Sequence, residues 1–323
     1  MPLPSLLLDR LAVPVIGAPM IAVCHPPLTI AQCTAGIIGA FPALSARPQE
    51  LLEEWLLDIK EALSRFTTAN PGRKVAPFAV NQISHPSNVR LEQDLETCIR
   101  HEVPIIITSL GPSARIVKAV HAYGGIVLHD VSSSRHAEKA LAEGVDGLVL
   151  LCAGGGGLSG TLNPFAFVTE VRRFYDGFIA VSGGITSGRG VAAIRALGAD
   201  AAYMGTRFIA SSEARADPDY QQMIMDCRAS DILFTPHING VPGSFMRPSI
   251  VAAGLDPDRL EPRDKSSFDI NHKERPSAWS RIWSAGHGVG NIVDVPPVAT
   301  IVARLKDEYD AALADMRALA PTT

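Results

Sequence analysis

The sequence predicts an α/β protein built as a (β/α)₈ barrel, the TIM barrel, and three observations carry this prediction. Short apolar runs alternate with helical patterns eight times before residue 210. Most of these runs are continuously apolar, which is typical of strands buried on both faces, as in parallel sheets. A long segment rich in proline and glycine follows the eighth run. We therefore expect a barrel with an inserted lid-like segment after strand eight.

Each expected strand coincides with one apolar run. In chain order the runs are Val13–Met20, Gly36–Phe41, Pro77–Ile83, Val103–Leu110, Gly125–Val131, Gly147–Ala153, Phe178–Gly184 and Ala201–Phe208. Helical patterns between them include Gln49–Arg65, Asn88–His101, Ser134–Glu143 and a helix that begins at Asn163-Pro164. An open doubly wound sheet is the best alternative, but no GxGxxG motif follows the first strand.

The unit Phe178–Phe208 reads as strand, helix and strand, with a glycine turn after each strand. The carboxyl ends of neighbouring barrel strands lie side by side on the face that carries function. Backbone N–H groups at Gly183, Gly184, Gly205 and Thr206 could therefore converge on one phosphate, with no side chains in the way. Two ordinary tight turns are the structural alternative.

The chain divides into three expected parts. Residues 1–230 form the barrel, residues 231–294 form the inserted lid or substrate segment, and residues 295–323 form a C-terminal helix that packs back on the barrel. Ser211–Cys227 has a helical pattern, whereas the lid segment has little periodicity and many prolines. Such a long irregular segment is usually functional, so we expect it to cover the barrel mouth.

Composition excludes several classes of function. The 323 residues are 47% hydrophobic and carry a net charge of −4, so neither nucleic acid nor an anionic membrane surface is an expected partner. Five cysteines form no CxxC pair, which predicts no metal site and fits a reducing cytoplasm. No signal peptide or membrane span is expected. The expected partner is a small-molecule substrate, and the sequence leaves the oligomeric state open.

Six motifs give the chain a resemblance to a known family. In chain order they are Gly17-Ala-Pro-Met20, Val80-Asn-Gln82, Cys152-Ala-Gly-Gly-Gly-Gly-Leu-Ser-Gly160, Ser182-Gly-Gly184, Met204-Gly-Thr-Arg207 and Ile282-Trp-Ser-Ala-Gly286. Together they resemble the nitronate monooxygenases, formerly called 2-nitropropane dioxygenases, which are FMN-dependent barrels. The resemblance implies an FMN-dependent oxidoreductase that oxidises alkyl nitronates with O₂.

The resemblance also implies which residues bind FMN. They are Ala18, Pro19 and Met20 as a wall against the ring, Asn81 at its polar edge, Ala153, Gly154, Gly156, Gly157 and Gly160 in a loop beside it, and Ser182, Gly183, Gly184, Met204, Gly205 and Thr206 around the phosphate.

One position departs from the family pattern. Many relatives carry a catalytic histidine in the glycine-rich loop after strand six, and Leu158 stands there in this chain. Because leucine cannot accept a proton, the resemblance predicts a preference for preformed nitronates over neutral nitroalkanes. Two alternatives stay open: an FMN-dependent reductase or dehydrogenase that uses NAD(P)H or an enoyl or acyl thioester, and a catalytically silent flavin-binding protein.

Few other side chains are candidates for acid–base chemistry. His129 and Asp130 end the fifth strand, where both are expected to point toward the barrel mouth. Ser159 could donate a hydrogen bond to flavin or substrate, although it also suits a turn. His287, near the C-terminal motif, is flanked by glycines and could reach a ligand.

Overall fold

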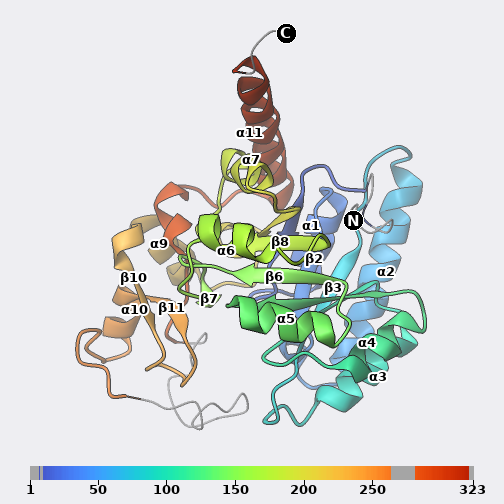
Figure 1. Cartoon of the computed structure of the whole chain (residues 1–323), viewed down its shortest axis with the longest axis horizontal. Coiled ribbons are helices and arrows are strands. Elements are labelled where there is room, and N and C mark those ends of the chain that lie inside the picture. Colours follow the sequence, from blue (N-terminus) through green and yellow to red (C-terminus); the bar gives the residue numbers. More distant parts are fainter. Residues whose placement is uncertain (1–6, 8–9, 263–280, 320–323) are drawn as a thin grey trace.

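The computed structural model describes residues 7, 10–262 and 281–319. Its centre is a barrel of eight parallel strands surrounded by helices, as the sequence predicts (Figure 1). The barrel strands are β1 (Val15–Gly17), β2 (Gly39–Pro42), β3 (Phe78–Ile83), β4 (Ile105–Ser109), β5 (Ile126–Val131), β6 (Gly147–Leu151), β8 (Phe178–Ser182) and β9 (Ala201–Met204). Each overlaps one expected run.

The sheet closes between its first and second strands. β1 pairs in parallel with β9, and Ile16 forms a parallel bridge with Ile38 just before β2. The backbone N–H of Ile38 donates to the Val15 carbonyl at 3.1 Å, and Gly17 N–H donates to the Ile38 carbonyl at 2.8 Å. Closure brings the carboxyl ends of all eight strands around one mouth.

Helices cover the outside of the barrel between successive strands. They are α1 (Pro26–Thr34), α2 (Leu51–Ala69), α3 (Leu91–Arg100), α4 (Ala114–His121), α5 (Ser134–Ala142), α6 (Pro164–Val171), α7 (Gly188–Ala196) and the short α8 (Thr206–Ile209), with a 3₁₀ turn η1 (Ala43–Ser45) after β2. Asn163 caps α6 with Pro164 at its first position, as expected from the sequence.

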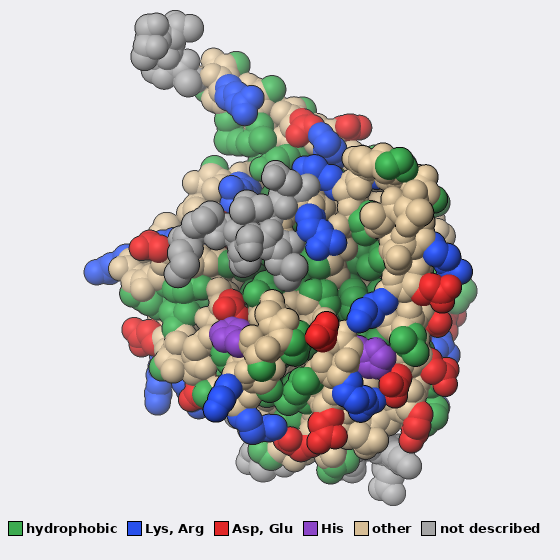
Figure 2. Space-filling view, turned by 90° about the vertical axis from the view of Figure 1, so that its right-hand side faces the viewer, with side chains coloured by type: hydrophobic (Ala, Val, Ile, Leu, Met, Phe, Trp, Pro, Cys, Tyr) green, Lys and Arg blue, Asp and Glu red, His purple; other side chains and the backbone are tan. Residues whose placement is uncertain are grey.

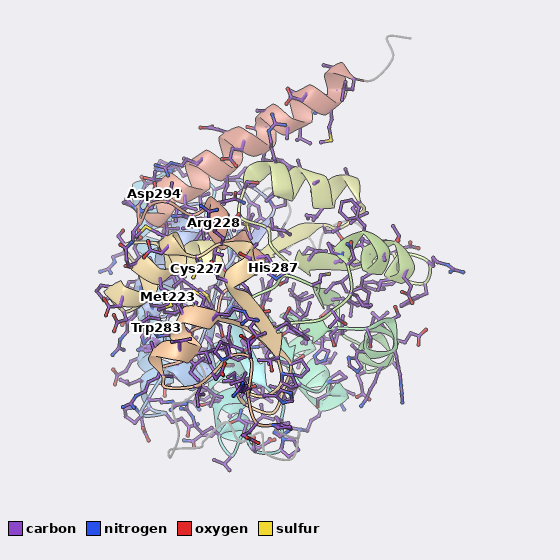
Figure 3. The ribbon with its side chains drawn as sticks, turned by 90° about the vertical axis from the view of Figure 1, so that its left-hand side faces the viewer. Met223, Cys227, Arg228, Trp283, His287 and Asp294 are labelled. Atoms are coloured by element: carbon purple, nitrogen blue, oxygen red, sulfur yellow. The ribbon has the colours of Figure 1, made fainter. Side chains whose placement is uncertain are left out.

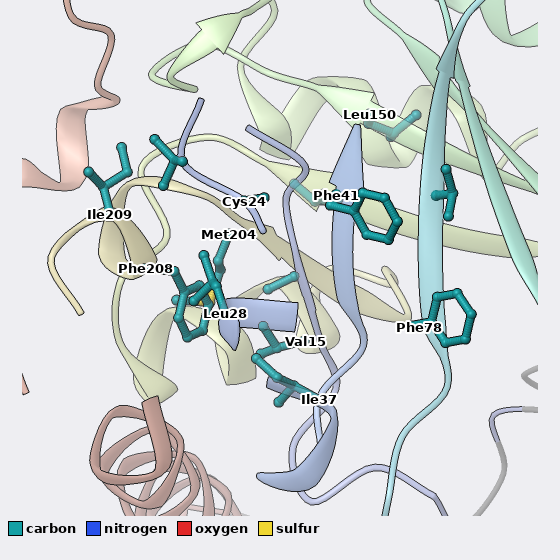
Figure 4. Packing of buried hydrophobic residues seen from close by; sticks show 14 of the residues in the cluster. Val15, Cys24, Leu28, Ile37, Phe41, Phe78, Leu150, Met204, Phe208 and Ile209 are labelled. Atoms are coloured by element: carbon teal, nitrogen blue, oxygen red, sulfur yellow. The ribbon is translucent and has the colours of Figure 1, made fainter. Parts of the chain in front are cut away.

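Alternate residues of each strand face two different hydrophobic layers. Ile105 and Ile107 of β4 lie in the cluster inside the barrel, to which every barrel strand contributes. Ile106 lies in the larger cluster between the strands and the helices, part of which Figure 4 shows around Val15, Leu28 and Met204. This period of two decides which strand residues can reach the barrel mouth.

The long final helix α11 (Val298–Ala318) packs beside α7 and completes the ring of helices (Figure 1). A Glu308 carboxylate oxygen accepts the Gly188 backbone N–H at the start of α7 at 2.6 Å, and Arg189 pairs with Asp315. The end of α11 projects beyond the barrel in Figure 1. α11 lies within the range 295–323 in which the sequence places a terminal helix, and residues 320–323 lie outside the described part of the chain.

The segment after the barrel has more regular structure than its sequence suggests. It contains α9 (Pro218–Asp226), η2 (Ala229–Asp231), β10 (Ile232–Thr235), β11 (Gly243–Met246), α10 (Arg247–Ala252) and η4 (His287–Asn291). The two strands pair in antiparallel fashion, and β11 also pairs with β7 (Gly157–Leu158) from the glycine-rich loop. Residues 263–280 of the expected lid lie outside the described residues.

The helix expected over Ser211–Cys227 is shorter than predicted. Pro218 occupies the first helical position of α9, and the Asp217 side chain caps it by accepting the Asp219 N–H. Because proline cannot donate the N–H that a continuing helix needs, the helix begins there. The Ser211 hydroxyl instead donates to the Phe208 carbonyl at 2.7 Å and closes the preceding turn.

Surface charge is mixed. Figure 2 shows Lys and Arg interspersed with Asp and Glu on the face that carries α2, α3 and α4. Among the described helices, none combines the length and the apolar composition that crossing a bilayer requires.

Candidate active site

A cavity of about 1080 Å³, including its open mouth, lies at the carboxyl ends of the barrel strands. Its walls come from the ends of seven barrel strands, the loop after β1, the glycine-rich loop and the segment after the barrel. The lining residues are Ala18, Pro19, Met20, Ile21, Val23, Pro42, Asn81, Ile83, Ser109, Asp130, Leu151, Gly156, Gly157, Leu158, Ser182, Tyr203, Gly205, Thr206, Ile209, Tyr220 and Ser284. Eleven of the residues singled out from the sequence therefore line this one cavity.

The turns after β8 and β9 present free backbone donors. Gly183 and Gly184 have φ angles of +136° and +68°, which side-chain-bearing residues rarely adopt. Within the described ranges, the backbone N–H groups of Gly183, Gly184 and Thr206 have no hydrogen-bond partner. A Cβ placed on Gly184 would meet nothing nearer than the Cβ of His287 at 3.9 Å. Unpaired N–H groups beside open space fit an anion such as a phosphate.

The loop after β1 forms an adjoining wall. Ala18 N–H donates to the Met204 carbonyl at 2.9 Å, and Met20 N–H donates to the Cys24 sulfur at 3.2 Å. A Cβ on Gly205 would lie 3.2 Å from Met20 Sδ and 3.4 Å from Ala18 Cβ. Glycine therefore keeps the two loops close together, and the wall they share is mostly apolar. Met204 itself points into the layer between strands and helices and does not line the cavity.

Across the mouth, the ends of β3, β4 and β5 carry a chain of hydrogen bonds. Asn81 Nδ2 donates to the Ile107 carbonyl at 3.0 Å and to Ser109 Oγ at 2.8 Å. Ser109 Oγ in turn donates to Asp130 Oδ2 at 2.5 Å, while Asp130 Oδ1 is buried without a partner. Burial raises the pKa of Asp130 to about 7, against the lowering effect of the Ser109 hydrogen bond. The cavity is thus lined by a carboxyl group whose pKa lies near neutral pH.

The expectation that His129 points toward the mouth is wrong. Its neighbours Leu128 and Asp130 face the barrel interior and the cavity, so the alternation of side chains turns His129 outward. It is 3% exposed, and its Nδ1 lies 2.7 Å from Thr108 Oγ1. Burial lowers the pKa of His129 to about 4, which keeps the imidazole neutral. This histidine has no route to a substrate in the cavity.

The glycine-rich loop serves two purposes. Gly156, Gly157 and Leu158 line the cavity, and Leu158 pairs with Gly243 of β11. The other predicted glycines do not line the cavity: a Cβ on Gly160 would clash with the Leu151 carbonyl oxygen, and Gly154 has a φ of +83°, with His287 Nδ1 3.2 Å from an added Cβ. Leu158, which the resemblance places at the position of the family histidine, therefore faces the cavity.

Two other predicted loop residues do not line the cavity. Ser159 is buried, and its hydroxyl donates to the Cys152 carbonyl at 3.1 Å, which holds the turn. Ala153 N–H donates to the Leu162 carbonyl at 2.8 Å. Both residues therefore shape the loop from behind, and the Ser159 hydroxyl is not directed at a ligand in the cavity.

The segment after the barrel adds Tyr220, which no sequence motif indicated, and places the Ile282–Gly286 motif beside it. Tyr220 donates its hydroxyl to the Ser284 carbonyl at 2.5 Å and stacks on Trp283 with ring centres 5.0 Å apart. Ser284 Oγ is buried without a partner at the cavity wall. His287 is exposed, and its N–H donates to the Gly154 carbonyl at 2.9 Å (Figure 3). The C-terminal motif thus packs against the glycine-rich loop.

Comparison with known proteins identifies the family. The sequence model described as nitronate monooxygenase matches residues 11–253, which is most of the chain. The chain belongs to the nitronate monooxygenase family. It is accordingly a flavin-dependent oxidoreductase that acts on a small molecule.

Two characterised relatives and one solved structure are similar to the chain over much of its length. A nitronate monooxygenase of Paraburkholderia phytofirmans is 26% identical over 98% of this chain and 97% of its own length. A (3aS,4S,5R,7aS)-5-hydroxy-7a-methyl-1-oxo-octahydro-1H-indene-4-carboxyl-CoA dehydrogenase of Rhodococcus jostii is 25% identical over 74% of this chain and 64% of its own. The solved nitroalkane oxidase of Streptomyces ansochromogenes shares the fold, with a TM-score of 0.76, 21% identity and coverage of 96% and 100% of the two chains.

Proposed function

We propose that the protein binds FMN and oxidises alkyl nitronates with O₂. The observation that carries the FMN assignment is a cavity lined by Ser182, Gly205 and Thr206 on one side and by Ala18, Pro19 and Met20 on the other. The unpaired N–H groups of Gly183 and Gly184 directly follow Ser182 in the turn after β8, and that of Thr206 lies at the cavity wall. These two features match the phosphate and the flat apolar ring of a flavin mononucleotide. When bound, FMN supplies the electron chemistry.

The residues of the chain would bind and orient the ligands. Ser182, Gly183 and Gly184, with Gly205 and Thr206, would hold the phosphate. Asn81 has both amide hydrogens engaged by the protein, so its Oδ1 remains to accept a hydrogen bond from the polar edge of the ring. Leu158 would cover the substrate and exclude water from it.

The test is direct. Purified protein is denatured, and the released flavin is identified as FMN or FAD. The native protein is then mixed anaerobically with the nitronate of 2-nitropropane, and flavin absorbance is followed before and after O₂ is admitted. We expect FMN, rapid bleaching by the nitronate and recovery with O₂. Release of FAD, or no response to the nitronate, would contradict the corresponding half of the proposal.

A second candidate is a flavin-dependent reductase or dehydrogenase acting on a CoA thioester or using NAD(P)H. The observation that favours it is the similarity to the Rhodococcus CoA dehydrogenase, together with an apolar cavity wall that includes Ile21, Ile83 and Ile209. Bleaching of the flavin by NADPH, or its reoxidation by an enoyl thioester, would identify this activity. A flavin that responds to none of these compounds would indicate a silent flavin-binding protein.

We also propose that residues 231–294 shape substrate access over a barrel formed by residues 1–230, while the terminal helix from residue 295 supports the barrel. Ser284 brings this part of the chain to the cavity, where its carbonyl accepts the Tyr220 hydroxyl, and β11 pairs with the loop that carries Leu158. All five cysteines are free and buried, which supports residence in a reducing cytoplasm.

A further inference from the structure

We propose that Asp130 is the general base of this active site, which removes the proton from the carbon that bears the nitro group of a neutral nitroalkane. The inference deepens the proposed function and rests on it. It assigns to a carboxyl group on β5 the role that the family histidine plays from the glycine-rich loop, where this chain has Leu158.

The cavity offers no other group for this step. Among the described residues that line it, Asp130 is the only carboxyl group, and no histidine, lysine, arginine or cysteine is present. Tyr203 and Tyr220 also line it, but burial raises the pKa of each phenol well above the ordinary range. A tyrosine that stays protonated cannot act as a base near neutral pH.

The surroundings of Asp130 suit proton exchange. From β4, the Ser109 hydroxyl donates to Oδ2, and its direction is fixed because Asn81 from β3 donates to the same hydroxyl oxygen. That hydrogen bond favours the ionised carboxylate, whereas burial opposes it, and the two effects leave the pKa of Asp130 at about 7. Across the barrel, the phenol of Tyr203 on β9 is the titratable group that interacts with Asp130. It stays neutral, because burial raises its pKa.

The step is balanced without any other reactant. The carboxylate of Asp130 takes the proton, so that an O–H bond forms as the C–H bond breaks. The electron pair of that bond moves into the nitro group and gives the nitronate, which is the substrate of the proposed oxidation. General-base help of this kind contributes about 10²–10⁴-fold to the rate.

The experiment compares the holoprotein with Asp130→Asn, and with His129→Gln as the control on the neighbouring, outward-facing residue. Anaerobic flavin reduction is measured with neutral 2-nitropropane and with its preformed nitronate across pH 5.5–8.5. In the native protein, the rate with the neutral compound should rise with pH and level off above about pH 7, because the base must be ionised. The rate with the anionic nitronate should fall over the same range, because like charges repel.

Asp130→Asn should lose roughly 10²–10⁴-fold with the neutral compound, keep its rate with the nitronate and lose the pH step in both. His129→Gln should resemble the native protein. If Asp130→Asn retains the neutral-compound rate, or loses both rates equally, the proposal is wrong; equal loss would mean that Asp130 supports the flavin or the fold.

A second readout does not depend on the substrate. The folded protein releases the Asp130 proton near pH 7, whereas the unfolded chain releases it near pH 4, so the unfolded state binds fewer protons between these values. The native protein should therefore lose stability relative to Asp130→Asn as pH rises from about 4 to 7, with no further change above.

Urea unfolding at several pH values measures this difference. If neither nitro compound reduces the flavin but the stability of the native protein relative to Asp130→Asn still falls between pH 4 and 7, the nitronate proposal fails. Asp130 then stays supported as the proton-exchanging group of the cavity. If the difference in unfolding free energy between the native protein and Asp130→Asn does not change with pH, Asp130 does not titrate near pH 7 and its assignment as the base is wrong.

Discussion

The two sides of the cavity recognise ligands by different means. At the ends of β8 and β9, the donors are backbone N–H groups of Gly183, Gly184 and Thr206, and none of the described residues that line the cavity on this side is charged. At the ends of β3, β4 and β5, the polar atoms belong to side chains: Asn81 donates a hydrogen bond to Ser109, which donates one to Asp130. The first side has a fixed charge distribution, whereas the second can gain or lose a proton.

This difference separates binding from chemistry. A cradle of backbone dipoles favours an anion at any pH, because amide groups do not titrate in the physiological range. A half-buried carboxyl group such as that of Asp130 responds to small changes in pH and in its hydrogen bonds. We call the ends of β8 and β9 the glycine side of the cavity, and the ends of β3, β4 and β5 the carboxyl side. We therefore expect substitutions on the glycine side to alter cofactor affinity, and substitutions on the carboxyl side to alter reaction rates and their pH dependence.

Apart from the replacement of Asp130 itself, the largest effect should come from Gly184→Val. Valine is disfavoured at a φ of +68°, and its side chain would fill the space where the phosphate is proposed to bind. A hydrogen bond to a charged group contributes about 1.5–3 kcal/mol, so losing one or two should weaken FMN binding by roughly 10²–10³-fold. The measurement is FMN affinity of the flavin-stripped protein by fluorescence titration.

Gly124→Val is the matched control. Gly124 also has a positive φ, +83°, and no atom lies within 4 Å of an added Cβ. It precedes β5, at the end of the barrel opposite the cavity, so the variant carries similar backbone strain but should keep native FMN affinity. If Gly184→Val keeps native FMN affinity, or if both variants lose FMN affinity equally, the ends of β8 and β9 do not form the phosphate site.

The glycine side could be predicted from the sequence because its signal is local. A buried run followed by Ser182-Gly-Gly184 specifies both the turn and the exposed N–H groups within a few residues. The eight-strand barrel was predicted for the same reason, since each strand and helix has its own pattern. The pairing of β7 with β11 was not, because it joins residues far apart in the chain.

The carboxyl side depends on which face of each strand meets the mouth, and residue type alone misleads there. Of His129 and Asp130, histidine is the more familiar base, but Leu128 occupies the barrel interior and so fixes Asp130 as the residue that reaches the cavity. The same alternation, applied to Ile105 and Ile107, would have identified Ser109. The missing signal was the alternation of side chains along each strand: a residue two positions after an apolar residue of the barrel interior lies on the same face and reaches the mouth.

A smaller effect is expected from Ser109→Ala. The Ser109 hydroxyl stabilises the ionised form of Asp130, so its removal should raise the pKa of that carboxyl group. The pH at which the neutral-nitroalkane rate is half maximal should move up by roughly one to two pH units, with FMN affinity unchanged. The measurement is the pH profile of anaerobic flavin reduction.

Thr108→Val tests whether that effect is specific. Thr108 is the preceding residue on β4, faces outward and contacts His129 Nδ1. Its replacement should leave the pH profile in place. A midpoint that stays constant in Ser109→Ala, or that moves to lower pH, would mean that the hydrogen bond to Asp130 does not control the proton.

The smallest effect should come from Leu158→His, which places the family's usual base in the cavity. Leu158 is half-buried on β7 and lines the cavity, so an imidazole there can reach the same ligand. A C–H proton is removed by one base at a time, and Asp130 already supplies one. The neutral-nitroalkane rate should therefore rise less than about tenfold, well below the ~10²–10⁴-fold that a first general base provides.

Leu158→Gln separates basicity from polarity, because glutamine adds hydrogen-bonding atoms without a group that titrates near neutrality. We expect Leu158→His and Leu158→Gln to differ little in flavin reduction by 2-nitropropane at pH 8, where Asp130 is ionised. At pH 6, where most Asp130 is protonated, the histidine variant should gain the more, since an imidazole with an ordinary pKa near 6.5 is still partly neutral. A gain of 10²-fold or more at pH 8, confined to histidine, would show that the native site lacks a base, and the carboxyl side would then be a binding surface like its neighbour.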